Sequence, residues 1–162
     1  MGIFALAALM ATALPAAEAP TDPSGFVSGA TQAGLVEVEL AQLALASSGN
    51  VAVKQFATRM ATDHRAANAE LAAMAAAKGI AVPNALDADH RKMITGLRGK
   101  TGKAFDAAYA AHMVQDHAAA VELFQANVSH PDGELAAFAG KTLPVLQEHK
   151  RLADNLQANL KK

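Results

Sequence analysis

The sequence predicts an all-α fold, a four-helix bundle whose second and third long helices are joined by a longer connection that contains a short helix. Apolar residues make up 52% of the 162 residues, and alanine is the commonest of them, which favours helix. These residues recur at intervals of three and four over four long stretches, as on one face of a helix. No stretch alternates polar and apolar residues for long enough to form a strand. Four amphipathic helices of this kind pack as a bundle.

The first nineteen residues are predicted to be an export signal that is cleaved after Ala19. An apolar run over residues 3–14 precedes the small-x-small sequence "AEA", and the run is too short to span a bilayer. An apolar N-terminal helix is the alternative. Residues 20–25 follow as a linker rich in turn residues. The mature chain contains no further candidate membrane span, so we expect it in the periplasm or cell envelope.

The bundle domain is predicted over residues 26–160. Its four long helices are expected at about residues 26–46, 51–78, 103–128 and 132–160. The turn over residues 47–50 combines residues that end one helix and cap the next, and Gly79 stops the second helix. A short helix is expected over residues 87–97. Pro144 lies inside the last helix and should kink it, because it removes the hydrogen bond to the carbonyl of Gly140.

The phrase Met-x-x-Asp-His occurs twice, in "RMATDHRAANAEL" and in "HMVQDHAAAVELF". It places His64 on the apolar face of the second long helix and His117 at the matching position of the third. His149 lies on the apolar face of the fourth helix, and Glu37 on that of the first. Counting 1.5 Å per residue from the connecting turns places all four at a similar depth. One ionisable residue per helix is therefore expected to face inward.

Imidazole and carboxylate groups from facing helices are how metal sites in bundles are built. The predicted metal ligands are Glu37, His64, His117 and His149. The residues predicted to support or join them are Asp63, Asp116, Met60, Met113 and His112. Each aspartate is expected to fix the tautomer of the histidine beside it. The methionines lie one turn away on the same face, and thioethers beside imidazoles favour copper, with iron and zinc as the alternatives. His90 lies in the connection between the second and third long helices and His130 in the turn before the fourth, and both should be solvated.

Composition excludes several other functions. The net charge of −1, the 18% of charged residues and the 4% of aromatic residues give no basis for binding nucleic acid. There is no cysteine, so the chain has no disulfide and no thiolate ligand. No nucleophile–base pair is evident, which favours a protein that is not an enzyme. Two alternatives stay open: a metal-dependent oxidoreductase using the same cluster, and an envelope-stress protein with a purely structural polar core and no metal. The sequence does not identify a protein partner.

Several stretches resemble the domain-of-unknown-function family 4142 (DUF4142). They are "FVSGATQAGLVEVELAQLA", "VKQFATRMATDHRAANAEL", "KGIAVP", "FDAAYAAHMVQDHAAAVELF" and "LAAFAGKTLPVLQEHKRLA". The resemblance covers about residues 24–158. It implies a ferritin-like four-helix fold in bacterial exported proteins that are often described as outer membrane proteins, and it implies no established activity. The wider ferritin-like superfamily builds di-iron sites from Glu and Glu-x-x-His. No Glu-x-x-His occurs here, so we expect a mononuclear histidine-rich site or none.

Overall fold

The computed structural model describes residues 22–162, and all regular secondary structure in this range is helical. The helices are α1 (Pro23–Ser47), α2 (Val51–Ala77), α3 (Ala88–Arg98), α4 (Gly102–Asn127) and α5 (Gly133–Leu160). The prediction of an all-helical fold is confirmed. The predicted export signal lies outside the described residues.

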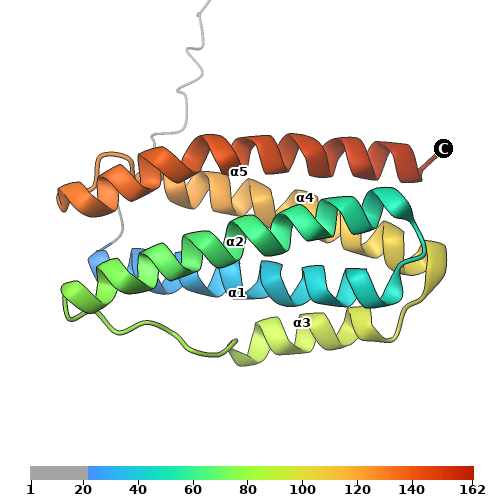
Figure 1. Ribbon diagram of the computed structural model, residues 1–162, viewed down its shortest axis with the longest axis horizontal. Helices are drawn as coiled ribbons and strands as arrows, with labels where there is room; N and C mark the ends of the chain where they lie inside the picture. Colours follow the sequence, from blue (N-terminus) through green and yellow to red (C-terminus); the bar gives the residue numbers. More distant parts are fainter. Residues whose placement is uncertain (1–21) are drawn as a thin grey trace, which may run out of the picture.

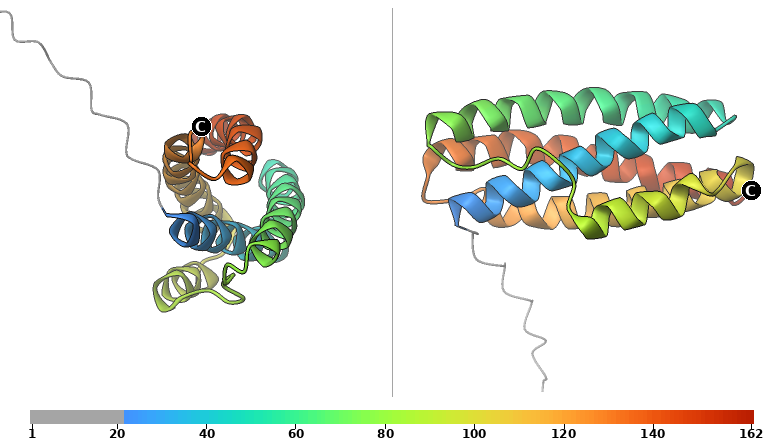
Figure 2. Two further views of the ribbon diagram at one scale, coloured as in Figure 1. Left: turned by 90° about the vertical axis from the view of Figure 1, so that its left-hand side faces the viewer. Right: turned by 90° about the horizontal axis from the view of Figure 1, so that it is seen from below.

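The four long helices lie side by side, and the short helix α3 lies outside them (Figure 1). α1 packs most extensively against α2, and α4 against α5, and each of these pairs is antiparallel. Contacts of α1 with α4 and of α2 with α5 join the two pairs around a common core, as the end-on view in Figure 2 shows. α3 contacts α1 and α4. The long loop that leads into α3 is therefore the connection expected between the second and third long helices.

Helix boundaries follow from capping side chains. Asp22 accepts hydrogen bonds from the backbone N–H groups of Ser24 and Gly25, and Pro23 occupies the first helical position, where its missing N–H costs nothing. α1 therefore begins three residues before the predicted Phe26, and part of the predicted linker is helical. Proline is a turn residue in many sequences, but after an aspartate, as at Pro23, it is equally a helix-start signal.

The start of α2 and the end of α2 lie close to where they were predicted. Asn50 caps α2 by accepting from the N–H groups of Ala52 and Val53. Gly79 follows the last turn with a φ of 67°, a conformation that costs glycine little because it has no Cβ. Asp132 caps α5 in the same way as Asn50 caps α2. α5 continues through Pro144 as helix to Leu160.

The core consists of two apolar clusters. The first includes Leu40, Val53, Met60, Tyr109, Met113 and Ala153. The second includes Phe26, Leu71, Phe124, Leu135, Phe138 and Leu146. On α2, α4 and α5 a buried histidine falls between the residues given to one cluster and those given to the other: His64, His117 and His149. On α1 the buried Glu37 follows Val36, the first residue that this helix gives to the first cluster. A polar layer therefore crosses the middle of the molecule between two dry regions.

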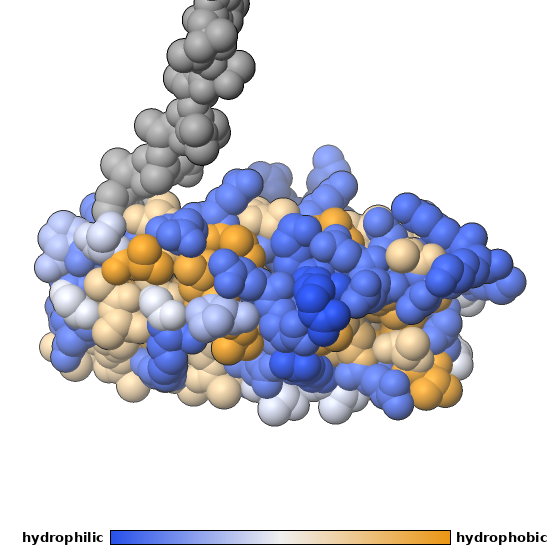
Figure 3. Space-filling model, turned by 90° about the horizontal axis from the view of Figure 1, so that it is seen from above, coloured by the Kyte–Doolittle hydropathy of each residue, from blue (hydrophilic) through white to orange (hydrophobic). Residues whose placement is uncertain are grey.

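The outer surface carries mainly hydrophilic side chains. The face seen from above Figure 1, where α5 lies, shows hydrophilic residues with smaller hydrophobic groups scattered between them (Figure 3). Among the described residues, the exposed large hydrophobic side chains are Leu45, Val51 and Val145. None of the helices described over residues 22–162 combines the length and apolar character needed to cross a membrane.

Candidate metal centre

Three histidines from three different helices meet in the polar layer. His64 comes from α2, His117 from α4 and His149 from α5, with 7%, 1% and 1% of their surfaces exposed. The ring centroids form a nearly equilateral triangle: 5.6 Å between His64 and His117, and 5.4 Å from His149 to each of them. One ring nitrogen from each lies within 4.8 Å of the other two. The structure thus gathers three of the four predicted ligands.

His117 has its tautomer fixed by the backbone. Its Nδ1 lies 2.9 Å from the carbonyl oxygen of Met113, one turn earlier on α4. A carbonyl only accepts, so Nδ1 carries the hydrogen and Nε2 carries a lone pair. That Nε2 faces the Nε2 of His64 at 3.5 Å. His117 is therefore oriented with its electron-donating nitrogen toward the centre of the cluster.

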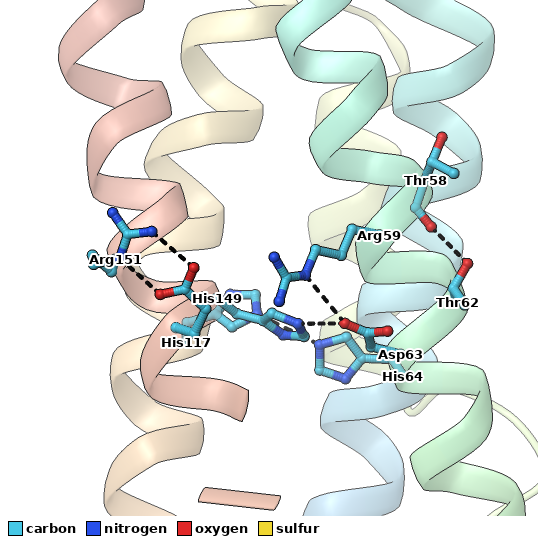
Figure 4. Close-up of polar contacts among 9 residues, drawn as sticks. Thr58, Arg59, Thr62, Asp63, His64, His117, His149 and Arg151 are labelled. Carbon is cyan, nitrogen blue, oxygen red and sulfur yellow. Dashed lines mark hydrogen bonds and ion pairs between the residues drawn. The ribbon is translucent and has the colours of Figure 1, made fainter. Parts of the chain in front are cut away.

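His149 has the opposite tautomer to His117, because a carboxylate binds its Nε2. Its Nε2 lies 2.8 Å from Oδ2 of Asp63, which also contacts Nε of Arg59 at 3.4 Å (Figure 4). Because an ionised carboxylate accepts, Nε2 carries the hydrogen and Nδ1 is the nitrogen with the lone pair. The His149 Nδ1 is buried and has no hydrogen-bond partner in the described structure. A buried lone pair without a partner is costly, and a metal ion is one way to satisfy it.

The spacing of the imidazole nitrogens fits a metal ion. In a tetrahedral site with metal–nitrogen bonds of ~2.1 Å, neighbouring ligand nitrogens lie about 3.4 Å apart. The 3.5 Å between the Nε2 atoms of His64 and His117 is close to that edge. One ring nitrogen of His149 lies within 4.8 Å of a nitrogen of each of the other two histidines.

The electrostatics keep all three imidazoles neutral. Burial, together with the neighbouring His117 and His149, lowers the pKa of His64 to about 3. Burial also lowers the pKa of His117 to about 4, against the opposing effect of its bond to the Met113 carbonyl. The pKa of His149 is lowered by burial as well, although Asp63 counteracts this. Neutral imidazole is the form that binds metals, so the set is ready to do so at neutral pH.

Glu37 lies beside the triad and not within it. Its Oε1 is 3.6 Å from His117 Nδ1, on the side of that ring directed away from His64. Glu37 is 3% exposed, and neither carboxylate oxygen has a hydrogen-bond partner in the described structure. Burial raises the pKa of Glu37 well above its usual range, and the charge of Asp116 raises it further. Glu37 was predicted as the fourth ligand, but it lies outside the group of three histidines, where it could stabilise the Nδ1–H of a metal-bound His117.

The other predicted site residues are only partly gathered. Asp63 was expected to orient the adjacent His64, but it holds His149 from the next helix. Asp116 was expected to orient His117, but it pairs with His112 on the outer side of α4, with 2.9 Å between Oδ2 and Nε2. Adjacent residues on a helix point about 100° apart, so an aspartate beside an inward histidine reaches a neighbouring helix or its own surface instead. His112 is accordingly not part of the triad.

Three further residues complete the surroundings of the site. The side chains of Met60 and Met113 are fully buried in the apolar cluster one turn from the histidines. Tyr109 was not singled out from the sequence, yet its buried hydroxyl has no hydrogen-bond partner in residues 22–162, and the charge of Glu37 contributes to raising its pKa. Tyr109 precedes Met113 and His117 by steps of four residues, and that spacing could have found it.

Of the two histidines expected in solvent, one is buried. His90 lies on α3 with its Nδ1 2.7 Å from Asp87 Oδ2, and 40% of its side chain is exposed. His130 is only 6% exposed, because its ring stacks on Phe26 at a centroid distance of 6.5 Å. The prediction for His130 was wrong because a loop residue can be covered by the end of a neighbouring helix.

Two cavities reach the histidines from opposite sides. One, of about 520 Å³, lies between α1 and α4 next to the start of α3, and His64, His117 and Glu37 line it. The other, of about 260 Å³, lies between α2 and α5, and His64, His149 and Asp63 line it. The triad is therefore buried without being sealed, and a small ion or ligand has room to approach it.

Comparison with known families identifies the chain's relatives. The family described as Domain of unknown function (DUF4142) matches residues 8–156, which is most of the chain. The chain belongs to this family. The resemblance stated from the sequence is thereby confirmed. No match was found among curated proteins.

Solved structures with a similar fold come from a different family of unknown function. A DUF305 fragment from Deinococcus radiodurans has a TM-score of 0.75 at 16% identity, covering 88% of this DUF4142 chain and 99% of the fragment. A DUF305 protein from Streptomyces coelicolor has a TM-score of 0.73 at 17% identity, with 86% and 92% covered. At these identities the likeness concerns the fold alone.

Proposed function

We propose that this DUF4142 protein binds a divalent transition-metal ion through His64, His117 and His149, within a ferritin-like four-helix bundle. The observation that carries this proposal is the convergence of three buried, neutral imidazoles. Two of them use one ring nitrogen to donate a hydrogen bond to a group outside the triad: His117 to the carbonyl of Met113, and His149 to Asp63. An ordinary polar core layer would pair its lone pairs internally. The His149 Nδ1 instead stays unpaired and buried beside the other two rings.

The donor set favours one class of metal. Three imidazole nitrogens without thiolate suit copper, zinc, iron or nickel more than magnesium or calcium, which prefer oxygen ligands. Among divalent ions of the first transition row, copper(II) binds such ligands most tightly. With Glu37 outside the triad, the centre is mononuclear. A fourth ligand then comes from water or a small molecule, because open positions are common where three histidines hold a metal.

Metal analysis and thermal unfolding together test this function. Protein purified from its native compartment without a histidine tag should contain one equivalent of copper or zinc by elemental analysis. At a metal concentration of about a hundred times Kd, binding to the folded state alone should stabilise it by about 2.7 kcal/mol. His64→Ala, His117→Ala and His149→Ala should each abolish that shift, whereas His90→Ala should keep it. Equal destabilisation by the three variants with and without metal would instead identify a structural polar layer.

We also propose that the protein is exported to the periplasm or cell envelope and cleaved after Ala19. The apolar run followed by "AEA" supports this proposal. The intact mass of the protein isolated from its own cells should lack the first nineteen residues, and fractionation should recover it outside the cytoplasm. A full-length cytoplasmic species as the sole product would contradict the proposal.

A further inference from the structure

The two cavities beside the triad differ in charge. The cavity between α1 and α4 is lined by the carboxylates of Glu37, Asp87 and Asp116 and by no lysine or arginine. The cavity between α2 and α5 is lined by Lys141, whose Nζ lies 2.5 Å from Oε1 of Glu70, another lining residue. Among the described residues, the α2–α5 cavity thus has a lysine beside its acidic groups, whereas the acidic groups of the α1–α4 cavity have only histidines near them.

The three carboxylates of the α1–α4 cavity lie at increasing depth. The exposed fraction of the side chain falls from 49% for Asp87 to 31% for Asp116 and to 4% for Glu37. Asp87 and Asp116 each contact a partly exposed histidine. Glu37, by contrast, has no hydrogen-bond partner in the described structure and lies beside His117. A buried carboxyl group whose two oxygens have no hydrogen-bond partner in the described structure, lining a cavity that ends at two of the three histidines, offers oxygen ligands to a cation.

We propose that the α1–α4 cavity is the route by which the metal cation reaches the histidines, with Asp87 and Asp116 at its mouth and Glu37 as the last carboxylate before the triad. This inference rests on the proposed function. A cleft lined by charge of one sign concentrates ions of the other sign and raises their association rate. A cation entering dry protein also needs ligands that replace its water, and the carboxylates supply oxygen atoms at successive depths.

A matched pair of alanines tests the route. Ala119 on α4 lines the acidic cavity, Ala66 on α2 lines the opposite one, and both are exposed. Phenylalanine at either position obstructs one cavity without touching a ligand. Tyr109 is the only tyrosine of the chain, and there is no tryptophan. The buried ring of Tyr109 lies two helical turns from His117, so quenching of tyrosine fluorescence by Cu²⁺ reports the arrival of the ion at the triad. Stopped-flow mixing of the full chain with Cu²⁺ gives the association rate.

Ala119→Phe should slow association several-fold, and Ala66→Phe should leave it unchanged. Because obstruction slows entry and exit alike, Ala119→Phe should also slow Cu²⁺ removal by a chelator and leave the equilibrium Kd unchanged. Asp116→Asn removes charge without adding bulk, and at low ionic strength it should reduce the rate by about tenfold at most, since steering by a whole cleft is worth ~10- to 1,000-fold. That loss should shrink as salt is added.

Other outcomes separate the route from the site. If wild type binds no Cu²⁺ at equilibrium, the proposed function and the route fail together. If wild type binds Cu²⁺ and only Ala66→Phe slows association, the ion enters between α2 and α5 and the route is wrong. If neither variant slows it, local opening of the helices admits the ion, and the route is again overturned while the metal site stands. Circular dichroism spectra and melting curves of the three variants verify that each is folded.

Discussion

His149 and the carboxylate that orients it come from different helices. Asp63 lies beside His64 in the chain, yet its hydrogen bond to His149 Nε2 joins α2 to α5 and leaves Nδ1 of His149 buried without a hydrogen-bond partner in the described structure. Such outer partners fix the ring and raise the basicity of the ligand nitrogen. The side chain of Asp63 is one-third exposed, and its carboxylate also contacts Arg59. Its contribution to the free energy of folding should therefore be small compared with its contribution to metal affinity.

Asp63→Asn should weaken metal binding by about 10- to 100-fold with little change in the stability of the metal-free protein. The amide can still accept a hydrogen bond from Nε2, but it does not stabilise the positive charge that metal binding induces on the ring. Isothermal titration with Cu²⁺ or Zn²⁺ measures the effect, and Asp116→Asn at equilibrium in moderate salt is the matched control. Equal losses in both variants would show that Asp63 acts only through the overall charge.

On the scale of a helix, Pro144 is the unusual residue. It occupies the interior of α5 on the exposed side, five residues before His149, and it lacks the N–H that would bond to the carbonyl of Gly140. The cost of an interior proline relative to alanine reaches about 3 kcal/mol. A costly residue close to the triad is consistent with a local bend that sets the position of His149.

Pro144→Ala should therefore raise the free energy of unfolding of the metal-free protein, by up to about 3 kcal/mol. The same substitution should weaken metal binding, because a straighter α5 displaces His149 from the other two rings. Urea unfolding of this variant measures the change in the free energy of unfolding, and metal titration measures the change in affinity. Greater stability with unchanged metal affinity would assign Pro144 to packing alone.

Over the whole molecule, the buried ionisable groups make stability depend on pH. The histidine pKa values are lowered in the folded state, so below about pH 6.5 the unfolded chain binds more protons than the folded one. The stability that they contribute is present above that pH and is lost as the pH falls toward 4. Glu37 acts in the opposite direction, because its raised pKa makes the folded state hold a proton that the unfolded state releases. The three histidines together change the free energy of unfolding with pH more than the single carboxyl group of Glu37 does.

The metal-free protein should therefore lose stability on acidification from pH 7 to pH 5, by about 1.4 kcal/mol per pH unit for each net proton taken up on unfolding. Urea unfolding at several pH values measures the slope. His64→Ala should make it shallower, since one buried imidazole is lost. Glu37→Gln should make it steeper, since the opposing group is lost, and His90→Ala should leave it unchanged. A slope that is the same in all four proteins would mean that these groups do not control it.

Local patterns in the sequence were sufficient to predict the helices and the inward direction of the polar residues. Repeats of three and four residues, capping residues and Gly79 are local signals, so the helix ends were predicted to within about three residues. The same periodicity placed Glu37 and the three histidines on buried faces, because a face is a property of one helix. The layer in which they lie followed from counting residues to the connecting turns.

Which of these side chains meet depends on the packing of the helices. Whether Asp63 orients His64 or His149, and whether Glu37 joins the triad or lies behind His117, depends on how the helices are rotated and on rotamers that no residue spacing specifies. The acidic cavity has the same origin, since it combines Asp87 before α3 with Glu37 on α1 and Asp116 on α4. Contacts between segments far apart in the chain arise from packing, and packing depends on all the helices at once.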